Sequence, residues 1–412
     1  MAIRVLLDSR RSRTLVRESR IPAISTRKRV FLDSTGVPRG SNRHIPRHRW
    51  VASTVALALV LAACRSDDVS RTPRFHALPW PAADRLFHQD PRWLGADSAY
   101  SVALGSHRTL WLFGDTFVAT APGSSRPGSR MIRNSVGVQI GDDPSSAAMT
   151  FYWPSEGGEP RSFFEPAAGD EWLWPGHGVE IGDELLLFFL RMRPSGREGM
   201  WNFESFGNTA FLVENPDEQP PAWRLRQLVV PDNAFGVHLS GGALVDGPHL
   251  YVYGVSEPDH RVCVARWLLV DVERGDLSGP AWWCGSSRGW VSQLSIEGAP
   301  EPILRGAQTE FTVHRDPEHG PFVMTHTKGF GAAVIEQCFA DRPEGPWSES
   351  VVVYRPDEMS VKDVMIYAAK AHPQLRGADL VLTYATNSFD FGAMASSPTL
   401  YYPRFVRLTR DR

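Results

Sequence analysis

The sequence is poor in cysteine and, after its first 64 residues, poor in lysine. It has 4 Cys in 412 residues, and their spacing matches no zinc-binding pattern, so we expect neither a metal nor another cofactor. Beyond residue 64 the only lysines are Lys328, Lys362 and Lys370, and that part has a net charge of −12. Because nucleic-acid binding needs a basic surface to replace counterions, it is excluded. Composition also excludes a collagen, a coiled coil and a wholly disordered chain.

The apolar run at residues 51–63, VASTVALALVLAA, is too short to cross a bilayer as a helix. It follows a basic segment at residues 44–49 and is typical of the apolar region of a signal peptide. Its end, Leu61-Ala62-Ala63-Cys64, resembles the lipobox of bacterial lipoproteins. That resemblance implies cleavage before Cys64 and lipid attachment to its sulfur. A plain secretory signal with a coincidental cysteine is the alternative.

We therefore expect three segments in the precursor. Residues 1–64 are a basic extension with a lipoprotein signal peptide, residues 65–74 are a linker, and residues 75–412 are the working domain. The mature protein would lie outside the cytoplasm in the bacterial cell envelope, held to the membrane through the lipid on Cys64. Because export leads to an oxidising compartment, Cys263 and Cys284 could pair across strands, leaving Cys338 as a buried thiol.

Short β-branched and aromatic runs alternate with Gly, Pro, Asp and Asn clusters after residue 64, and helical periodicity is almost absent. An apolar strand, a tight polar turn and a second strand recur in five units, at residues 97–117, 177–192, 240–255, 310–327 and 367–387. Further strands follow these hairpins, beginning near Ser135, Asn208, Cys263, Ala332 and Arg404, and we expect the one from Cys263 to run to residue 272.

Four-stranded units repeated five times predict an all-β fold, a five-bladed β-propeller. The last unit lacks an outer strand, and we expect residues 75–86 to supply it and to close the ring. A two-sheet β-sandwich is the alternative fold.

Two acids of the first hairpin are candidates for catalysis. Asp97 opens the first strand and Asp115 lies near the end of the second, at nearly opposite positions about the turn. Opposed residues share a face with Cβ atoms ~4.5–5.5 Å apart, although a one-residue slip would separate them. Paired carboxylates are the usual catalytic groups of a glycosidase. The cross-strand spacing favours retention of the configuration at the anomeric carbon over its inversion. Both acids could instead be turn residues that bond the backbone.

Residues around this hairpin resemble a family of secreted bacterial five-bladed propellers, first catalogued as a domain of unknown function, that includes endo-acting D-arabinanases. The motifs are Gly95-Ala96-Asp97, Leu110-Trp111-Leu112-Phe113-Gly114-Asp115-Thr116-Phe117 and Arg133-Asn134-Ser135. Residues 172–178 and 342–348, and Tyr367 with His372-Pro373, fit the same pattern. The last two also resemble the five-bladed furanoside hydrolases, such as arabinanases and invertases. The resemblance covers residues 75–410 and implies that Asp97 and Asp115 are the catalytic pair.

Glu310 begins the fourth hairpin and is a possible third acid. Further polar and aromatic residues near strand starts are candidates for substrate binding: Arg133, Asn134, Trp174, His177, Trp201, His238, Tyr367 and His372. A hydrogen-bonded structural histidine, or a tryptophan that packs between blades, is the alternative for each of these types.

The sequence thus predicts a monomeric, exported glycoside hydrolase of furanose-containing polysaccharide, such as arabinan or arabinogalactan. A non-catalytic glycan-binding or scaffolding lipoprotein is the alternative. A polysaccharide lyase would need a Tyr or His base beside cations that neutralise a uronate, and lysines are few.

Overall fold

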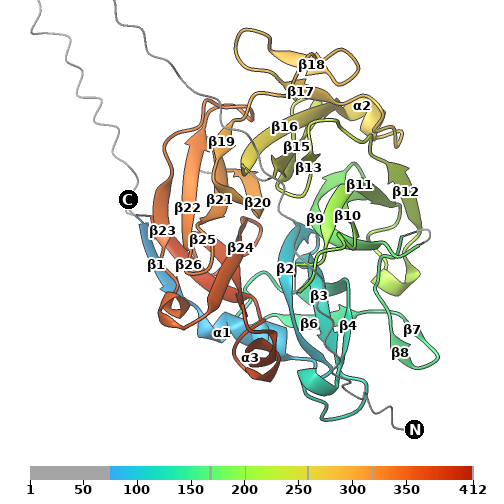
Figure 1. The fold of residues 1–412 in the computed structure, drawn as a ribbon, viewed down its shortest axis with the longest axis vertical. Coiled ribbons are helices and arrows are strands. Elements are labelled where there is room, and N and C mark those ends of the chain that lie inside the picture. The colour runs from blue at the N-terminus through green and yellow to red at the C-terminus, as the bar shows by residue number, and fades with distance from the viewer. Residues whose placement is uncertain (1–74, 167–168, 200, 258, 317–319, 411–412) are drawn as a thin grey trace, which may run out of the picture. The chain divides into compact units, whose positions relative to one another are not determined.

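The computed structural model describes residues 75–410 except 167–168, 200, 258 and 317–319. The expected signal peptide, the linker and Cys64 lie outside these residues. The described part is an all-β, propeller-like fold in which antiparallel sheets surround a centre (Figure 1). Within it, no helix is both long and apolar enough to cross a membrane.

All five expected hairpins are present, which confirms the strand prediction. They consist of β2 (Trp93–Ala103) and β3 (Arg108–Val118), β9 (Trp172–Ile181) and β10 (Glu184–Arg193), β14 (Ala243–Asp246) and β15 (His249–Ser256), β20 (Ala307–Arg315) and β21 (Phe322–Lys328), and β24 (Val364–His372) and β25 (Leu380–Ser388).

The expected following strands are also present, with one correction. They are β5 (Ser135–Ile140), β11 (Glu204–Val213), β16 (Arg261–Leu268), β22 (Val334–Ala340) and β26 (Arg404–Arg410). Residues 269–272, expected to continue β16, instead form the short helix α2 (Leu269–Val272). The outer strands are β6 (Ala148–Tyr152), β12 (Leu225–Val229), β23 (Val351–Tyr354) and β1 (Phe75–Pro79).

The remaining elements are short. They are α1 (Pro81–Asp84), the 3-10 turns η1 (Arg85–His88), η2 (Arg126–Gly128), η3 (Pro220–Ala222) and η4 (Asp357–Ser360), the helix α3 (Phe391–Ser396), and the strands β4 (Arg130–Ile132), β7 (Ser155–Glu156), β8 (Glu159–Pro160), β13 (Val237–His238), β17 (Ala281–Trp283), β18 (Trp290–Ser292) and β19 (Leu304–Arg305).

Four sheets have the regular four-stranded order of a propeller blade: β2-β3-β5-β6, β9 to β12, β20 to β23, and β24-β25-β26-β1. The third unit does not repeat this pattern, because its sheet has 7 short or unequal strands, β13 to β19. The expectation of five alike units is therefore wrong for this one. Its outer part is broken by α2 and by glycines with positive φ, where a regular strand cannot continue: Gly275, Gly285, Gly289 and Gly298.

The first and last parts of the chain meet in one sheet, as expected. β1 pairs antiparallel with β26, from Phe75 opposite Arg410 to Pro79 opposite Val406. The segment expected to close the ring, residues 75–86, is a strand only at its start, because residues 81–86 belong to α1 and η1. The added strand covers an edge of β26 that would otherwise be open to pairing with other chains.

Phe87 in η1 packs in the interior between the first and the last sheet. It is fully buried, stacks on Phe405 of β26 at a centroid distance of 5.0 Å, and meets Trp111 of β3 edge-on at 5.2 Å. One side chain therefore contacts both the first and the last sheet.

The predicted pairing of Cys263 with Cys284 is wrong in this structure. Cys263, Cys284 and Cys338 are all free and buried. The first two belong to one hydrophobic cluster with Trp267 and Trp282, so they serve as small apolar side chains.

We predict that Phe87→Ala lowers the free energy of unfolding by about 3–5 kcal/mol, the usual cost of emptying a buried aromatic site. Urea unfolding followed by tryptophan fluorescence measures the change. Val229→Ala, at a side chain that is 83% exposed, is the control and should change stability by less than about 0.5 kcal/mol. A loss below about 1 kcal/mol for Phe87→Ala would show that the junction is held elsewhere.

Candidate active site

The first hairpin carries Asp97 and Asp115 on its two paired strands, with an irregularity at Asp97. Ala96 pairs with Thr116 and Tyr100 pairs with Leu112. Between these pairs the ladder shifts, and Ser98 and Ala99 have φ values of 63° and 57°. A bulge of this kind re-aims the neighbouring side chain.

Gly114 makes room for the carboxyl group of Asp97. A methyl group at position 114 would overlap Oδ1 of Asp97 and would lie 2.8 Å from Oγ of Ser98. The Gly114-Asp115 pair of the motif therefore has a physical reason, since the carboxyl of Asp97 occupies the space of a side chain at position 114.

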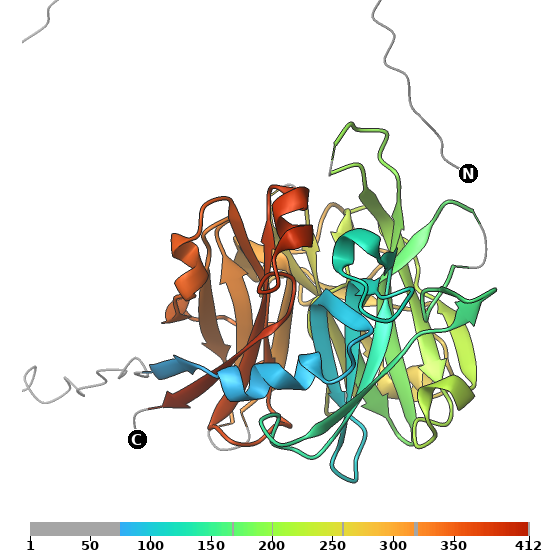
Figure 2. The same cartoon turned by 90° about the horizontal axis from the view of Figure 1, so that it is seen from below.

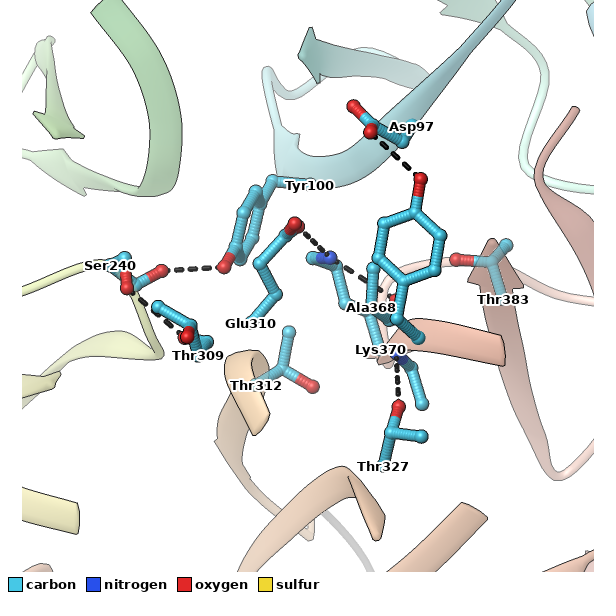
Figure 3. Close-up of polar contacts among 12 residues, drawn as sticks. Asp97, Tyr100, Ser240, Thr309, Glu310, Thr312, Thr327, Ala368, Lys370 and Thr383 are labelled. Atoms are coloured by element: carbon cyan, nitrogen blue, oxygen red, sulfur yellow. Dashed lines mark hydrogen bonds and ion pairs between the residues drawn. The ribbon is translucent and has the colours of Figure 1, made fainter. Parts of the chain in front are cut away.

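Two tyrosines hold Asp97, one on β24 of the last sheet and one on the loop between α3 and β26. The hydroxyl of Tyr367 donates to Asp97 Oδ2 at 2.8 Å (Figure 3), and the hydroxyl of Tyr401 donates to the same oxygen at 3.3 Å. Burial, followed by the negative charges of Glu310 and Asp115, raises the pKa of Asp97 to about 8, against a smaller lowering by Tyr367. Asp97 therefore holds its proton at neutral pH.

Asp115 has a different set of partners. Trp174 Nε1 donates to its Oδ1 at 2.9 Å, and Arg133 Nη1 lies 3.1 Å from its Oδ2. Burial raises the pKa of Asp115, and the positive charge of Arg133 lowers it. The guanidinium of Arg133 lies 4.5 Å from the ring centroid of Trp172, which fixes the cation beside the carboxylate.

Glu310 forms an ion pair with the buried Lys370. Lys370 Nζ lies 2.7 Å from Glu310 Oε2, and its side chain is 0% exposed against 21% for Glu310. The same ammonium donates to the carbonyl of Ala368 and lies 4.1 Å from the ring centroid of Tyr100 (Figure 3). Burial lowers the pKa of Lys370 and Glu310 opposes that shift. A buried ammonium needs such an anion to stay charged.

Four of the eight described non-glycine residues with positive φ lie at or beside these groups. Besides Ser98 and Ala99, Ala368 and Tyr401 have φ values of 57° and 63°, although left-handed conformations are uncommon for residues other than glycine. Ser98 and Ala99 follow Asp97, Ala368 follows Tyr367, and Tyr401 itself bonds Asp97. Such strain persists where the surrounding structure fixes the backbone in one conformation.

Arg126 holds the segment that carries Tyr401. Its guanidinium donates to the carbonyls of Leu94 at 2.6 Å, Ser397 at 2.7 Å and Leu400 at 2.6 Å, and to that of Met394 at 3.1 Å. One buried side chain thus joins the start of β2 to the loop after α3, and Tyr401 follows directly.

The structure brings six of the predicted residues together: Asp97, Asp115, Glu310, Arg133, Trp174 and Tyr367. Trp201 lies on the β10–β11 loop with 42% of its surface exposed. No contact of His238 with the acids is present among the described residues, and burial lowers the pKa of His238.

Two predicted binding residues are structural, which corrects those predictions. Asn134 is buried, and its amide bonds the backbone of Phe164 and Leu173. His372 is fully buried between the hydroxyls of Ser101 and Thr383. Because every polar atom of both side chains is engaged, neither has a group left for substrate.

His177 is bound to the backbone at Ala243, 3.1 Å from the carbonyl oxygen. Its ring centroid lies 5.7 Å from that of Tyr100. Burial lowers the pKa of His177 to about 4, so the imidazole is neutral at physiological pH.

Sequence reasoning missed Tyr401, Lys370 and Tyr100. Lys370 had a detectable signal, because it is a lone lysine in the apolar strand at residues 364–372. Tyr401 had none, since 304 residues separate it from Asp97.

Among the described residues, no group of three or more His, Cys, Asp or Glu side chains could hold a metal ion. A pocket of about 410 Å³ lies beside β11 and β12, lined in part by Glu171, Arg191 and Asp232. It contains none of the predicted site residues.

Residues 82–410 match the family model described as "Domain of unknown function (DUF5005)", and the chain therefore belongs to this family. A Bacteroides ovatus protein described as a "putative hydrolase" has a similar fold, with a TM-score of 0.65 and 17% identity over 81% of this chain and 90% of that chain.

Two other solved structures show lower similarity. The catalytic domain of the Coprinopsis cinerea GH62 alpha-L-arabinofuranosidase has a TM-score of 0.46 and 11% identity over 82% of this chain and 97% of that chain. The Bacteroides thetaiotaomicron endo-arabinase has a TM-score of 0.42 and 13% identity over 77% of this chain and 95% of that chain. No curated protein matches the chain.

We predict that the free energy of unfolding of Asp97→Asn, relative to that of the wild type, increases as pH rises. The folded-state pKa of Asp97 is about 8 against an ordinary value of 3.8, so the wild type gains a destabilising contribution between pH 4 and 8 as only the unfolded state ionises. The difference should grow by about 1.4 kcal/mol per pH unit at most and level off above pH 8. Urea unfolding of both proteins from pH 5 to 9 measures it, and a difference that does not change with pH would contradict the raised pKa.

Proposed function

We propose that this protein is a glycoside hydrolase that acts on a furanose-containing polysaccharide, such as an arabinan or arabinogalactan. The proposal rests on one observation: Asp115 and Glu310 lie close enough to Asp97 for their charges to raise its pKa, and only Asp97 among the three has two hydroxyl donors and no cation within hydrogen-bond distance. The description of the Bacteroides ovatus protein as a hydrolase agrees with this class. The furanose substrate rests on the resemblance of the sequence motifs.

Asp97 is the general acid in this proposal. With a pKa of about 8 it is protonated at neutral pH, and it transfers its proton to the glycosidic oxygen as the bond to the leaving sugar breaks. The charges of Asp115 and Glu310 keep the proton on Asp97 until an oxygen of the substrate takes it.

Asp115 is the partner carboxylate that supports the sugar cation, as nucleophile or as base toward water. Arg133 and the indole of Trp174 orient it and favour its charged form. Glu310, paired with Lys370, is the third acid and adds negative charge close to Asp97.

The two alternatives fit the site less well. A glycan-binding module needs no group of acids in the funnel. A lyase needs a tyrosinate or imidazole base, but burial and the charge of Asp97 raise the pKa of Tyr367 and of Tyr401 well above the ordinary value.

We also propose the features of the whole protein that the sequence predicts. The chain would be a monomeric lipoprotein of the cell envelope, exported by its signal peptide and anchored to the membrane through Cys64.

Replacement of the acids tests the proposal. Asp97→Asn and Asp115→Asn should each lower hydrolysis of arabinan and arabinogalactan by ~10²-fold or more, the usual contribution of such groups. Asp246→Asn, which removes an acid paired with Arg315 on the surface, should leave the rate unchanged. Near-normal release of reducing sugar by both variants would overturn the assignment.

Tyr367→Phe tests the role of Asp97 as acid. Because the hydroxyl of Tyr367 lowers the pKa of Asp97, its removal should move the alkaline limb of the pH–rate profile to higher pH. Tyr384→Phe is the control, since that hydroxyl donates to Glu358 at 2.7 Å and should not move the limb. A limb that stays in place in Tyr367→Phe would argue that another group sets it.

A further inference from the structure

Aromatic rings from separate loops touch one another in a series that begins at Asp115. Trp174, whose indole bonds Asp115, lies 4.8 Å from Phe203 by ring centroids. Phe203 lies 5.9 Å from Trp201 on the same β10–β11 loop. The series thus leads from an acid of the first sheet onto a loop of the second.

The series continues across to the fourth and fifth sheets. Trp201 lies 6.1 Å from Phe330 of the β21–β22 loop, and Phe330 lies 5.4 Å from Phe389, which follows β25. The contact between Trp201 and Phe330 bypasses the sheet of β13 to β19, although that sheet lies between the two in chain order. Figure 2 shows the β10–β11 loop, in green, and α3, in red, on the same side of the ring.

A second set of contacts leads back to the starting point. Phe391, two residues after Phe389, lies 6.4 Å from Phe117, and Phe117 is two residues after Asp115. Phe117 also meets Tyr401 edge-on at 5.4 Å. Arg126 bonds the loop after α3 to the start of β2, so hydrogen bonds as well as ring contacts join these two segments. We call the six rings of Trp174, Phe203, Trp201, Phe330, Phe389 and Phe391, with Phe117, the aromatic rim.

Several rings of the aromatic rim are exposed although they are large and apolar. Phe330 is 72% exposed, Phe391 52%, Trp201 42% and Phe389 37%. Clustered exposed apolar groups mark binding surfaces, and aromatic faces suit the C–H faces of sugar rings. Their continuity with Asp115 through Trp174 makes a sugar the occupant that the chemistry favours.

We propose that the aromatic rim encloses the acids and admits a chain end or a single-sugar branch, so that the enzyme removes terminal sugars. This inference rests on the proposed glycoside hydrolase function. The rings that meet have centroids 4.8–6.4 Å apart and are in van der Waals contact. The backbone joins Phe389 to Phe391 and Phe117 to Asp115, and Asp115 is bonded by Trp174, so a glycan chain cannot pass between these neighbours. Cleavage inside a polysaccharide requires a groove open at both ends, which a closed rim does not provide.

The product profile tests this inference. On a linear arabinan and a branched arabinogalactan, the wild type should release monosaccharide from the first minutes, with little fall in viscosity. Phe330→Ala opens the aromatic rim between the second and fourth sheets and should raise the share of longer products at least severalfold. Leu294→Ala, at a side chain that is 92% exposed and outside the rim, is the matched control and should keep the wild-type profile. An early ladder of oligosaccharides from the wild type would overturn the closed rim and leave the glycoside hydrolase function standing.

Binding separates the two proposals when no hydrolysis is seen. Tryptophan fluorescence of Asp97→Asn, titrated with arabino-oligosaccharides of one to six units, should show affinity that stops rising after two or three units. O-methylation of the terminal sugar should weaken binding by ~10-fold or more. Affinity that rises through six units and tolerates the cap would overturn the rim inference, and absence of both binding and hydrolysis would overturn the proposed function and the inference that depends on it.

Discussion

Everything at the candidate site depends on the joining of the first sheet to the last. Asp97 lies on β2 near the start of the described chain, and the two hydroxyls that hold it belong to Tyr367 and Tyr401, 270 and 304 residues away. β1 on β26 and Phe87 between Phe405 and Trp111 hold these distant parts together. If that junction opened, Asp97 would lose its hydroxyl donors and much of the burial that raises its pKa.

The junction also explains why strain is tolerated where it is. Left-handed backbone at Ser98, Ala99, Ala368 and Tyr401 costs free energy, and none of these is a glycine that would relieve it. Tight surroundings, including the carbonyls bound by Arg126 and the space left at Gly114, hold the backbone in place. Rigid placement of two hydroxyls on one carboxyl oxygen is the result, and a general acid benefits from a fixed orientation toward the bond that it protonates.

The hairpins could be predicted from the sequence because each is local: a turn of polar residues and alternation on either side determine register within about twenty residues. The same locality made it predictable that Asp97 and Asp115 lie on the two paired strands of one hairpin. Residue type alone did not reveal burial, so Asn134 and His372 were assigned to substrate although their polar atoms are all engaged inside the protein. Tyr401 and Arg126 were unpredictable, because their roles arise from contacts between segments far apart in the chain. The irregular third sheet escaped prediction because its strand-like residues 269–272 form a helix.

The three carboxyl groups of the site differ in their charged partners. Lys370 neutralises Glu310 from the buried side and Arg133 partly neutralises Asp115 from the exposed side, whereas Asp97 between them has only hydroxyl donors. Each cation lowers the free energy of its own carboxylate, and the two carboxylates together make ionisation of Asp97 unfavourable. Asp97, which has no cation beside it, thereby keeps its proton next to carboxyl groups that have cation partners, and acid catalysis beside a carboxylate requires such a difference. Burial is the largest cause of the raised pKa of Asp97, the charges of Glu310 and Asp115 add to it, and the hydroxyl of Tyr367 and the charge of Lys370 oppose it.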